Sequence, residues 1–274
     1  MTSAVVADDT LKEAYLELLK KSLTCSLYRG MGGANWEAKG LRGQILKLVL
    51  PREVQVQRIA QPSQRANGSD WPAIAQTMIG SRRLDNLQEC VETVLRDGVP
   101  GDFIETGVWR GGACILIKAV LRAHQVSDRV VWLADSFAGL PKPNAEKYPA
   151  DAGDRHHRLS HLAIPLEEVR ENFRRYDLLD EQVKFLKGWF KDTLPKAPIE
   201  KLAVARLDGD LYESTTDALE NLYDKLSVGG FLIVDDYGAV PACKRATEDF
   251  RARENIREEI KQIDGTGVYW RRER

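Results

Sequence analysis

Four aspartates stand in two pairs, and each pair comes directly after a run of apolar residues. Asp208 and Asp210 follow one run, and Asp235 and Asp236 follow the next. If the runs are neighbouring parallel strands, these carboxylates crowd together, which raises their pKa values and destabilises the fold unless a divalent cation offsets the charge. Oxygen ligands without a nearby Cys or His favour Mg²⁺, with Mn²⁺ or Ca²⁺ as substitutes. In the alternative, one acid of each pair only caps a helix or a turn.

A glycine-containing turn follows an earlier apolar run, with the spacing E-x-G-x-x-x-G from Glu105 through Gly107 to Gly111. Glycines let a backbone turn sharply and come close to a ligand. The spacing differs from the G-x-G-x-x-G fingerprint, which places a pyrophosphate on a helix N-terminus. A Glu two residues before Gly107 suits a cationic ligand such as S-adenosylmethionine. In the alternative, the glycines serve packing alone.

Two further runs end in residues that suit a bound nucleoside. Asp135 follows the second run, where a carboxylate can accept hydrogen bonds from both ribose hydroxyls. Asp135 could instead cap the next turn. Trp189 and Phe190 follow the third run, and their rings could cover an adenine face or belong to the core.

A parallel sheet would bring these residues together, and the chain has the pattern of one. Apolar runs at 103–105, 130–134, 183–186, 202–207 and 231–234 alternate with helical stretches at 84–95, 113–123, 166–179 and 215–226. Strands that are apolar on both faces indicate a mostly parallel sheet covered on both sides, which binds ligands at its carboxyl ends. Runs at 258–263 and 268–270 predict an antiparallel edge pair. We therefore expect a doubly wound α/β fold with a seven-stranded sheet.

Residues 1–72 are predicted to form an N-terminal helical extension that serves as an acceptor-side lid, and residues 73–274 to form the domain with the sheet. Apolar residues recur at helical spacing from Leu11 to Leu23, and residues 51–72 mix Pro, Gln, Ser and Gly without periodicity. Tyr28, Trp36 and Glu37 could stack on and hydrogen-bond a sugar, or could pack on the core or on a second copy of the chain.

The loop from Pro141 to Pro165 is predicted to fold over the acceptor as a second lid. It carries His156, His157 and His161 among Gly, Asp and Arg. One of these histidines could share the role of general base, although histidines on a polar loop are more often solvated.

Composition excludes several classes of partner. The chain has 40 Lys and Arg against 41 Asp and Glu, so its net charge of −1 gives no general attraction to nucleic acid or to an anionic membrane. No apolar run reaches the roughly 18 residues of a membrane span, and the first residues lack a secretion signal. Cys25, Cys90, Cys114 and Cys243 form no C-x-x-C pair and are predicted to be reduced thiols. We expect a soluble, cytoplasmic protein.

Five motifs, in order along the chain, resemble those of the macrocin O-methyltransferase family: IETGVWRGGACI, WLADSFAGLP, GWFKDTLP, LDGDLYEST and VGGFLIVDDYG. The resemblance extends from about Leu11 to Trp270. It implies a class I methyltransferase fold, S-adenosylmethionine as methyl donor, a Mg²⁺ ion and a homodimer. It also implies a sugar hydroxyl as acceptor, on natural-product glycosides such as macrolides and aminocoumarins.

The resemblance further implies roles for individual residues of this chain. Asp208, Asp235 and Asp236 would hold the metal, and Asp208 would also be the general base. The residues that would line the cofactor pocket are Met78, Glu105, Gly107, Asp135, Ser136, Phe137, Trp189 and Phe190.

The predicted reaction is an in-line transfer of a methyl group to a sugar hydroxyl. Correct positioning of the acceptor lowers the barrier, a metal lowers the pKa of the hydroxyl, and Asp208 takes the proton. One alternative is a catechol-type methyltransferase acting on a small vicinal diol, but that class has a Lys where this chain has Leu211. Another is a nicotinamide-dependent oxidoreductase, which would show G-x-G-x-x-G and would not need the aspartates. A binding module without catalysis is the third.

Overall fold

Seven strands form one mixed sheet with the order β3-β2-β1-β4-β5-β7-β6. The computed structural model describes residues 2–27, 61–70 and 73–274 and the single positions 40, 45, 48, 49 and 51, with only the backbone of residues 2–8. Tyr28, Trp36 and Glu37 lie outside the described residues. The chain divides into two units, Met1–Arg82 and Arg83–Arg274, and the sheet belongs to the second. The domain boundary at residue 72 stays a prediction.

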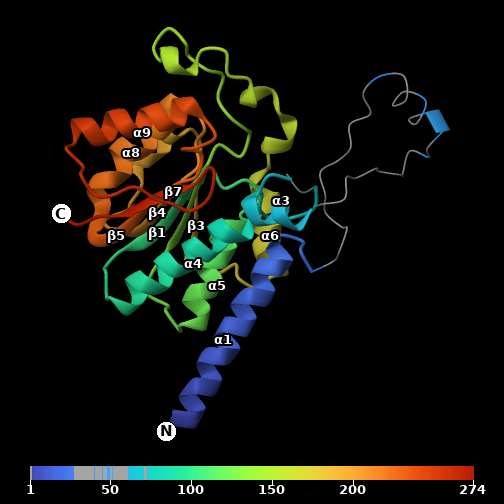
Figure 1. Ribbon diagram of the computed structural model, residues 1–274, viewed down its shortest axis with the longest axis vertical. Helices are drawn as coiled ribbons and strands as arrows, with labels where there is room; N and C mark the ends of the chain where they lie inside the picture. Colours follow the sequence, from blue (N-terminus) through green and yellow to red (C-terminus); the bar gives the residue numbers. More distant parts are fainter. Residues whose placement is uncertain are drawn as a thin grey trace. The chain divides into compact units, whose positions relative to one another are not determined.

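The five predicted parallel strands are confirmed and follow one another through helical crossovers (Figure 1). They are β1 (Asp102–Thr106), β2 (Val131–Asp135), β3 (Val183–Lys187), β4 (Leu202–Leu207) and β5 (Leu226–Val234). At one edge β7 (Val268–Arg271) pairs antiparallel with β5, and β6 (Lys261–Gln262) pairs antiparallel with β7. The doubly wound, mostly parallel α/β fold is therefore as predicted.

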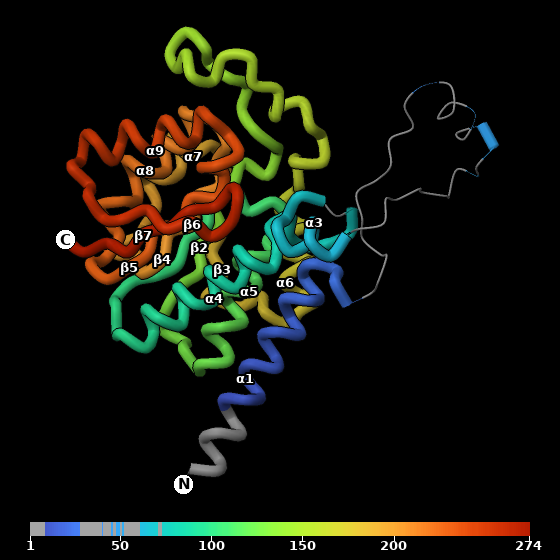
Figure 2. The backbone as a smooth tube through the Cα atoms, in the orientation of Figure 1, coloured from blue at the N-terminus to red at the C-terminus, as the bar shows by residue number. Residues whose placement is uncertain are grey.

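Helices cover both faces of the sheet, as the ribbon and the tube drawn in one orientation show (Figures 1 and 2). One layer holds α4 (Ser81–Arg96), α5 (Gly112–Ala123) and α6 (Leu166–Arg175), and the other holds α7 (Phe190–Thr193), α8 (Tyr212–Leu222) and α9 (Pro241–Arg253). Helix α5 packs on β1 and β2, and α8 packs on β4 and α9. Because both faces are covered, β4 is buried along its whole length.

Helix α9 was not predicted, because the face that it buries is weakly apolar. Cys243, Ala246, Thr247 and Phe250 are its buried residues. Their spacing is helical, but only Phe250 is large and apolar, so the period carries little hydrophobic contrast. Several predicted boundaries also differ. Helix α6 ends at Arg175 rather than residue 179, and α8 ends at Leu222 rather than residue 226, where β5 already begins. The strand expected at 258–263 is only the two-residue β6.

The first unit contains α1 (Thr2–Leu23) and α3 (Pro62–Asn67). The predicted helix is confirmed, and it begins nine positions before Leu11. Its predicted apolar face is wrong in part, because Leu11, Tyr15 and Leu18 are exposed and the buried residues are Leu16, Leu19, Lys20 and Leu23. Within this unit, Arg65 Nε forms a buried ion pair with Asp70 Oδ2 at 2.6 Å. Among the described residues of the whole chain, no helix is both long and apolar enough to cross a membrane.

Candidate active site

The order of the sheet places the site between β1 and β4. These strands are neighbours, and the chain leaves them toward opposite edges of the sheet, so their carboxyl ends border the crevice where doubly wound folds bind ligands. Thr106 and Leu207 are paired at the ends of the two strands. Gly107 and Asp208 follow them directly. The glycine turn and the acids, which lie far apart in sequence, therefore meet at one place.

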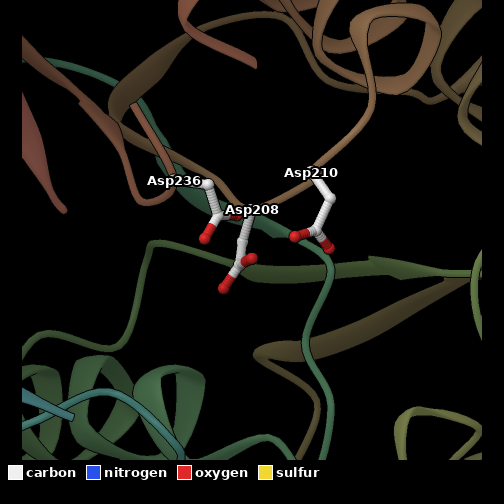
Figure 3. Close-up of side chains that lie close together, drawn as sticks. All are labelled: Asp208, Asp210 and Asp236. Atoms are coloured by element: carbon white, nitrogen blue, oxygen red, sulfur yellow. The ribbon is translucent and has the colours of Figure 1, made fainter. Parts of the chain in front are cut away.

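Three of the four aspartates converge there. Asp208, Asp210 and Asp236 each offer a carboxylate oxygen, and these oxygens lie within 4.8 Å of one another (Figure 3). Parallel pairing of Leu207 with Val234 brings the ends of β4 and β5 level. Asp210 has a backbone φ of +54°, a left-handed conformation that Asp adopts more readily than most residue types.

Burial and mutual repulsion oppose full ionisation of this cluster. Burial, followed by the charge of Asp208, raises the pKa of Asp210 to about 7. Burial and the neighbouring acids hold the pKa of Asp236 well above its ordinary value, and they raise that of Asp208 as well. Asp236 Oδ2 is buried and has no hydrogen-bond partner among the described residues. Surplus negative charge with an unpaired oxygen suits a bound cation.

Asp235, the third predicted metal ligand, has a different environment. It is 4 % exposed, and both of its oxygens face arginines. Arg83 Nη1 lies 2.5 Å from Oδ2, and Arg206 Nη2 donates to Oδ1. Each carboxylate oxygen has a second lone pair that a cation could use. The role of Asp235 as a ligand stays a prediction.

Arg206 of β4 is the centre of a buried group of ion pairs that the sequence analysis missed. Its Nη1 lies 2.5 Å from Glu105 Oε1 and 3.0 Å from Asp208 Oδ2, and its Nη2 pairs with Asp235. Burial alone would lower the pKa of Arg206, but the three carboxylates hold it well above its ordinary value. A lone arginine within the apolar strand LAVARL was the available signal, because a buried charge needs partners.

Glu105, a predicted cofactor residue, is 2 % exposed. Besides the contact of Oε1 with Arg206, its Oε2 accepts a hydrogen bond from Cys114 Sγ at 3.0 Å. Burial raises the pKa of Glu105 to about 7, although Arg206 opposes this. Protein groups thus satisfy both oxygens, and the predicted contact with the cofactor stays a prediction.

Gly107 lies directly against Asp208, just after the ends of β1 and β4. Its φ is +80°, and a Cβ on this residue would lie 1.8 Å from the carbonyl oxygen of Asp208. No side chain fits there without separating the two strand ends. Gly107 therefore has the packing role that was its alternative interpretation. Its role in cofactor binding stays a prediction.

We expect Gly107→Ala to lower the free energy of unfolding by about 3 kcal/mol or more, because backbone strain and steric overlap add. Gly98→Ala is the matched control, since Gly98 has a φ of +65° but nothing within 4 Å of its missing Cβ. That control should cost about 1 kcal/mol. Chemical denaturation of both variants is the measurement. Equal losses would show that the close approach to Asp208 is unimportant.

The turn after β2 is organised by Asp135. Its carboxylate accepts backbone N–H hydrogen bonds from Phe137 at 2.7 Å and from Val108 at 2.8 Å. Ser136 Oγ donates to the carbonyl of Gly139 at 2.6 Å. The capping role that was the alternative for Asp135 is thus present, and it ties this turn to the glycine turn after β1. The contact with a ribose stays a prediction.

The predicted aromatic residues differ in exposure. Phe137 is 7 % exposed and packs edge-to-face on Phe185, with ring centroids 6.3 Å apart. Trp189 is 37 % exposed, whereas Phe190 packs against the core. Met78 is half-buried and belongs to the first unit. The part that each plays in cofactor binding stays a prediction.

The loop after β2 is bonded to the site at two points. Asp151 is 1 % exposed and accepts hydrogen bonds from the backbone N–H groups of Tyr212 at 2.6 Å and Glu213 at 3.1 Å, so it caps α8. Further along, the carbonyl of His161 accepts a hydrogen bond from Trp109 Nε1 at 2.8 Å. The sequence analysis missed Asp151, because nothing local indicates that an acid will cap a helix so distant in sequence.

His156 of this loop pairs with an acid beside the cluster. Its Nδ1 lies 2.6 Å from Asp154 Oδ2, and its backbone N–H donates to Asp154 Oδ1 at 2.8 Å. Burial and Asp208 raise the pKa of Asp210, and the charge of His156 opposes this effect. A share of the base role for a histidine of this loop stays a prediction.

The strand order, the glycine turn after β1 and the acids after β4 and β5 define a class I methyltransferase. A family model described as macrocin O-methyltransferase (TylF) matches residues 12–272. The chain belongs to this family and is an S-adenosylmethionine-dependent O-methyltransferase. The resemblance stated from the five motifs is confirmed.

Characterised relatives align with most of the chain. A tetracenomycin enzyme of Streptomyces olivaceus, named 8-demethyl-8-(2,3-dimethoxy-alpha-L-rhamnosyl)-tetracenomycin-C 4'-O-methyltransferase, is 55 % identical over 95 % of this chain and 93 % of its own. Demethyldecarbamoylnovobiocin O-methyltransferase of Streptomyces niveus is 61 % identical over 77 % of this chain and 80 % of its own. Mycinamicin III 3''-O-methyltransferase of Micromonospora griseorubida is 48 % identical over 95 % and 96 %.

Solved structures agree with the fold. The O-methyltransferase NovP is 51 % identical and superposes with a TM-score of 0.86, over 96 % of this chain and all of that one. A calicheamicin methyltransferase, CalS11, is 20 % identical and has a TM-score of 0.57 over 70 % of this chain and 79 % of its own. The second likeness shows the fold alone.

Proposed function

We propose that this enzyme transfers the methyl group of S-adenosylmethionine to a sugar hydroxyl of a glycosylated natural product, in a reaction that needs Mg²⁺. The names of two characterised relatives specify a rhamnosyl-tetracenomycin and a mycinamicin as their substrates. These relatives cover nearly the whole chain, which supports the same class of acceptor here. The resemblance also supports a homodimer.

The acid cluster fits a hard divalent cation. Mg²⁺ binds oxygen ligands at about 2.1 Å, so oxygens on opposite sides of the ion lie about 4 Å apart, and the spread of up to 4.8 Å among Asp208, Asp210 and Asp236 is compatible with this. The unpaired Asp236 Oδ2 offers a further ligand atom. Asp208, Asp235 and Asp236 are the proposed ligands. A bound Mg²⁺ would lower the pKa of the acceptor hydroxyl.

Asp208 is the proposed general base, and Asp210 is a second candidate. Asp208 already accepts a hydrogen bond from Arg206 at 3.0 Å, which favours its ionised form. Asp210 has no ion pair within the described part of the chain, and it belongs to the same cluster. Either acid would take the proton of the sugar hydroxyl while the protein holds the acceptor oxygen in line with the methyl group.

The residues at the ends of β1, β2 and β3 are the proposed binding site for the methyl donor. The donor supplies an electrophilic methyl group on a sulfonium. In this proposal the Asp135 carboxylate binds the ribose, the backbone at Gly107 lies close to the donor, and Trp189, which is 37 % exposed, covers the adenine. All three residues lie at the carboxyl ends of parallel strands, where doubly wound sheets bind ligands, and this supports the assignment.

The convergence of Asp208, Asp210 and Asp236 beside the glycine turn is the observation that carries the proposal. We expect labelled S-adenosylmethionine to methylate members of a panel of glycosylated natural products when Mg²⁺ is present. EDTA should abolish the transfer, and added Mg²⁺ should restore it. The matching aglycones are the control, and they should accept no label.

Two results would contradict the proposal in different ways. Full activity in EDTA would remove the metal from the reaction and leave methyl transfer standing. Label on the aglycones would show that the acceptor is not a sugar hydroxyl.

A further inference from the structure

We infer that Arg83 and Asp264 are positioning residues for the acid site: together with the turn between β6 and β7, they hold Asp235 and Asp236 in place for a cation. The inference rests on the metal site of the proposed function. It assigns a role to a part of the sheet, the antiparallel edge, that none of the proposed catalytic steps uses.

The turn itself is rigid. Asp264 Oδ1 accepts hydrogen bonds from the backbone N–H groups of Thr266 and Gly267, both at 2.8 Å, and from Thr266 Oγ1 at 3.0 Å. Its other oxygen, Oδ2, lies 3.0 Å from Arg83 Nε, and the side chain is 1 % exposed. One carboxylate therefore closes the turn with one oxygen and holds an arginine with the other.

Arg83 connects the turn to the acid site. Its side chain is 8 % exposed; Nη1 donates a hydrogen bond to Asp235 Oδ2 at 2.5 Å, and Nε forms an ion pair with Asp264 Oδ2 at 3.0 Å. The guanidinium is a rigid planar cation, and one face of the contact is a hydrogen bond from Nη1 to Asp235 while the other is an ion pair between Nε and Asp264, so both acids are attracted to one fixed charge. Movement of Asp264 would therefore shift Asp235.

The backbone provides a second, independent connection to the same turn. The N–H of Gly238, two residues after Asp236, donates to the carbonyl of Thr266 at 2.7 Å. A Cβ on Gly238 would lie 2.3 Å from the carbonyl oxygen of Gly265, so the two segments are in close contact. The β6–β7 turn thus reaches Asp235 through Arg83 and directly contacts the segment that follows Asp236.

Such support has a function because the acids repel one another. Without a cation, the cluster would reduce its repulsion if the side chains moved apart, and a cation would then have to gather them again. Partners that orient metal ligands change metal affinity by roughly 10- to 100-fold when they are replaced. A role in folding alone would instead lower stability and leave cation affinity unchanged.

The test is calorimetric titration of the full-length chain with Mn²⁺, in the absence of acceptor, for the variants Arg83→Lys, Asp264→Asn and the double variant. Lysine keeps the charge but cannot contact both acids through separate nitrogens, and asparagine keeps the Oδ1 acceptor of the turn. Arg271→Lys is the matched control. Arg271 bonds to Asp97 and Gly229 at the opposite end of β7. Thermal unfolding and S-adenosylmethionine affinity are measured in parallel.

We expect Arg83→Lys to weaken Mn²⁺ binding about 10-fold and Asp264→Asn to weaken it less, with no change in the affinity for S-adenosylmethionine. The double variant should match Arg83→Lys alone, because Asp264 acts through Arg83. Mn²⁺ affinity equal to wild type in folded Arg83→Lys, or an equal loss in Arg271→Lys, would overturn the inference. Absence of Mn²⁺ binding to wild type would instead overturn the proposed metal site on which the inference rests.

Discussion

We expect Asp208→Asn to lower the rate of methyl transfer by about 10³-fold, the middle of the range for loss of a general base. Asparagine keeps the shape of the side chain but can neither take a proton nor give a cation a full negative charge. The fold should survive, because Arg206 keeps its contacts with Glu105 and Asp235. Initial rates with saturating substrate, together with Mn²⁺ titration, measure both duties of Asp208.

Asp210→Asn separates the two candidate bases. If Asp208 is both ligand and base, its variant loses cation affinity and rate together, and Asp210→Asn retains most of its rate. A collapse of the rate in Asp210→Asn with Mn²⁺ affinity intact would assign the base to Asp210. Undiminished transfer by Asp208→Asn would remove Asp208 from catalysis.

We expect Arg206→Met to lower the free energy of unfolding by about 3–5 kcal/mol, because the buried carboxylates that pair with Arg206 would lose their counter-charge. Glu105 and Asp235 are both nearly inaccessible to water, and Asp208 also faces the lost guanidinium. Denaturant titration of the purified variant is the measurement. Glu105→Gln/Arg206→Met should recover part of the loss, because the double variant buries one charge fewer.

The deficit of Arg206→Met should grow with pH. Burial raises the pKa of Glu105 from 4.5 to about 7 even with Arg206 present, and loss of the guanidinium raises it further. Up to about pH 7 both proteins hold the Glu105 proton in the folded state, so the deficit is constant there. Above that pH the wild type has released this proton and the variant has not, so only the variant continues to lose stability as the pH rises. A deficit that is the same at pH 5 and pH 8 would show that these carboxylates do not depend on Arg206.

The sheet could be predicted from the sequence because each parallel strand is an apolar run that ends at a polar turn. The runs that form β1 to β5 could be recognised without tertiary information, since a strand that is buried on both faces is apolar at nearly every position. Helix α9 lacks a clear apolar pattern, because its buried residues Cys243, Ala246 and Thr247 are small or polar. Its helical spacing is legible only once its buried face is known.

The acids were predictable in position but not in partnership. Strand ends placed all four aspartates in one region, yet the sequence could not show that Asp235 faces two arginines instead of joining the cluster of the other three. Arg83 and Asp151 were missed for the same reason. Each makes its decisive contact with a residue that is distant in the chain, and no local pattern encodes such a pairing.

The antiparallel edge of the sheet also sets an order of events during synthesis. Val268 of β7 pairs with Val234, and Asp264 reaches Arg83, so the acids at the end of β5 gain their support only after the last strand has left the ribosome. Until then β5 is an open edge with unpaired backbone groups, directly beside a cluster of like charges. A nascent chain therefore contains every proposed metal ligand before it contains the residues that hold these ligands in position.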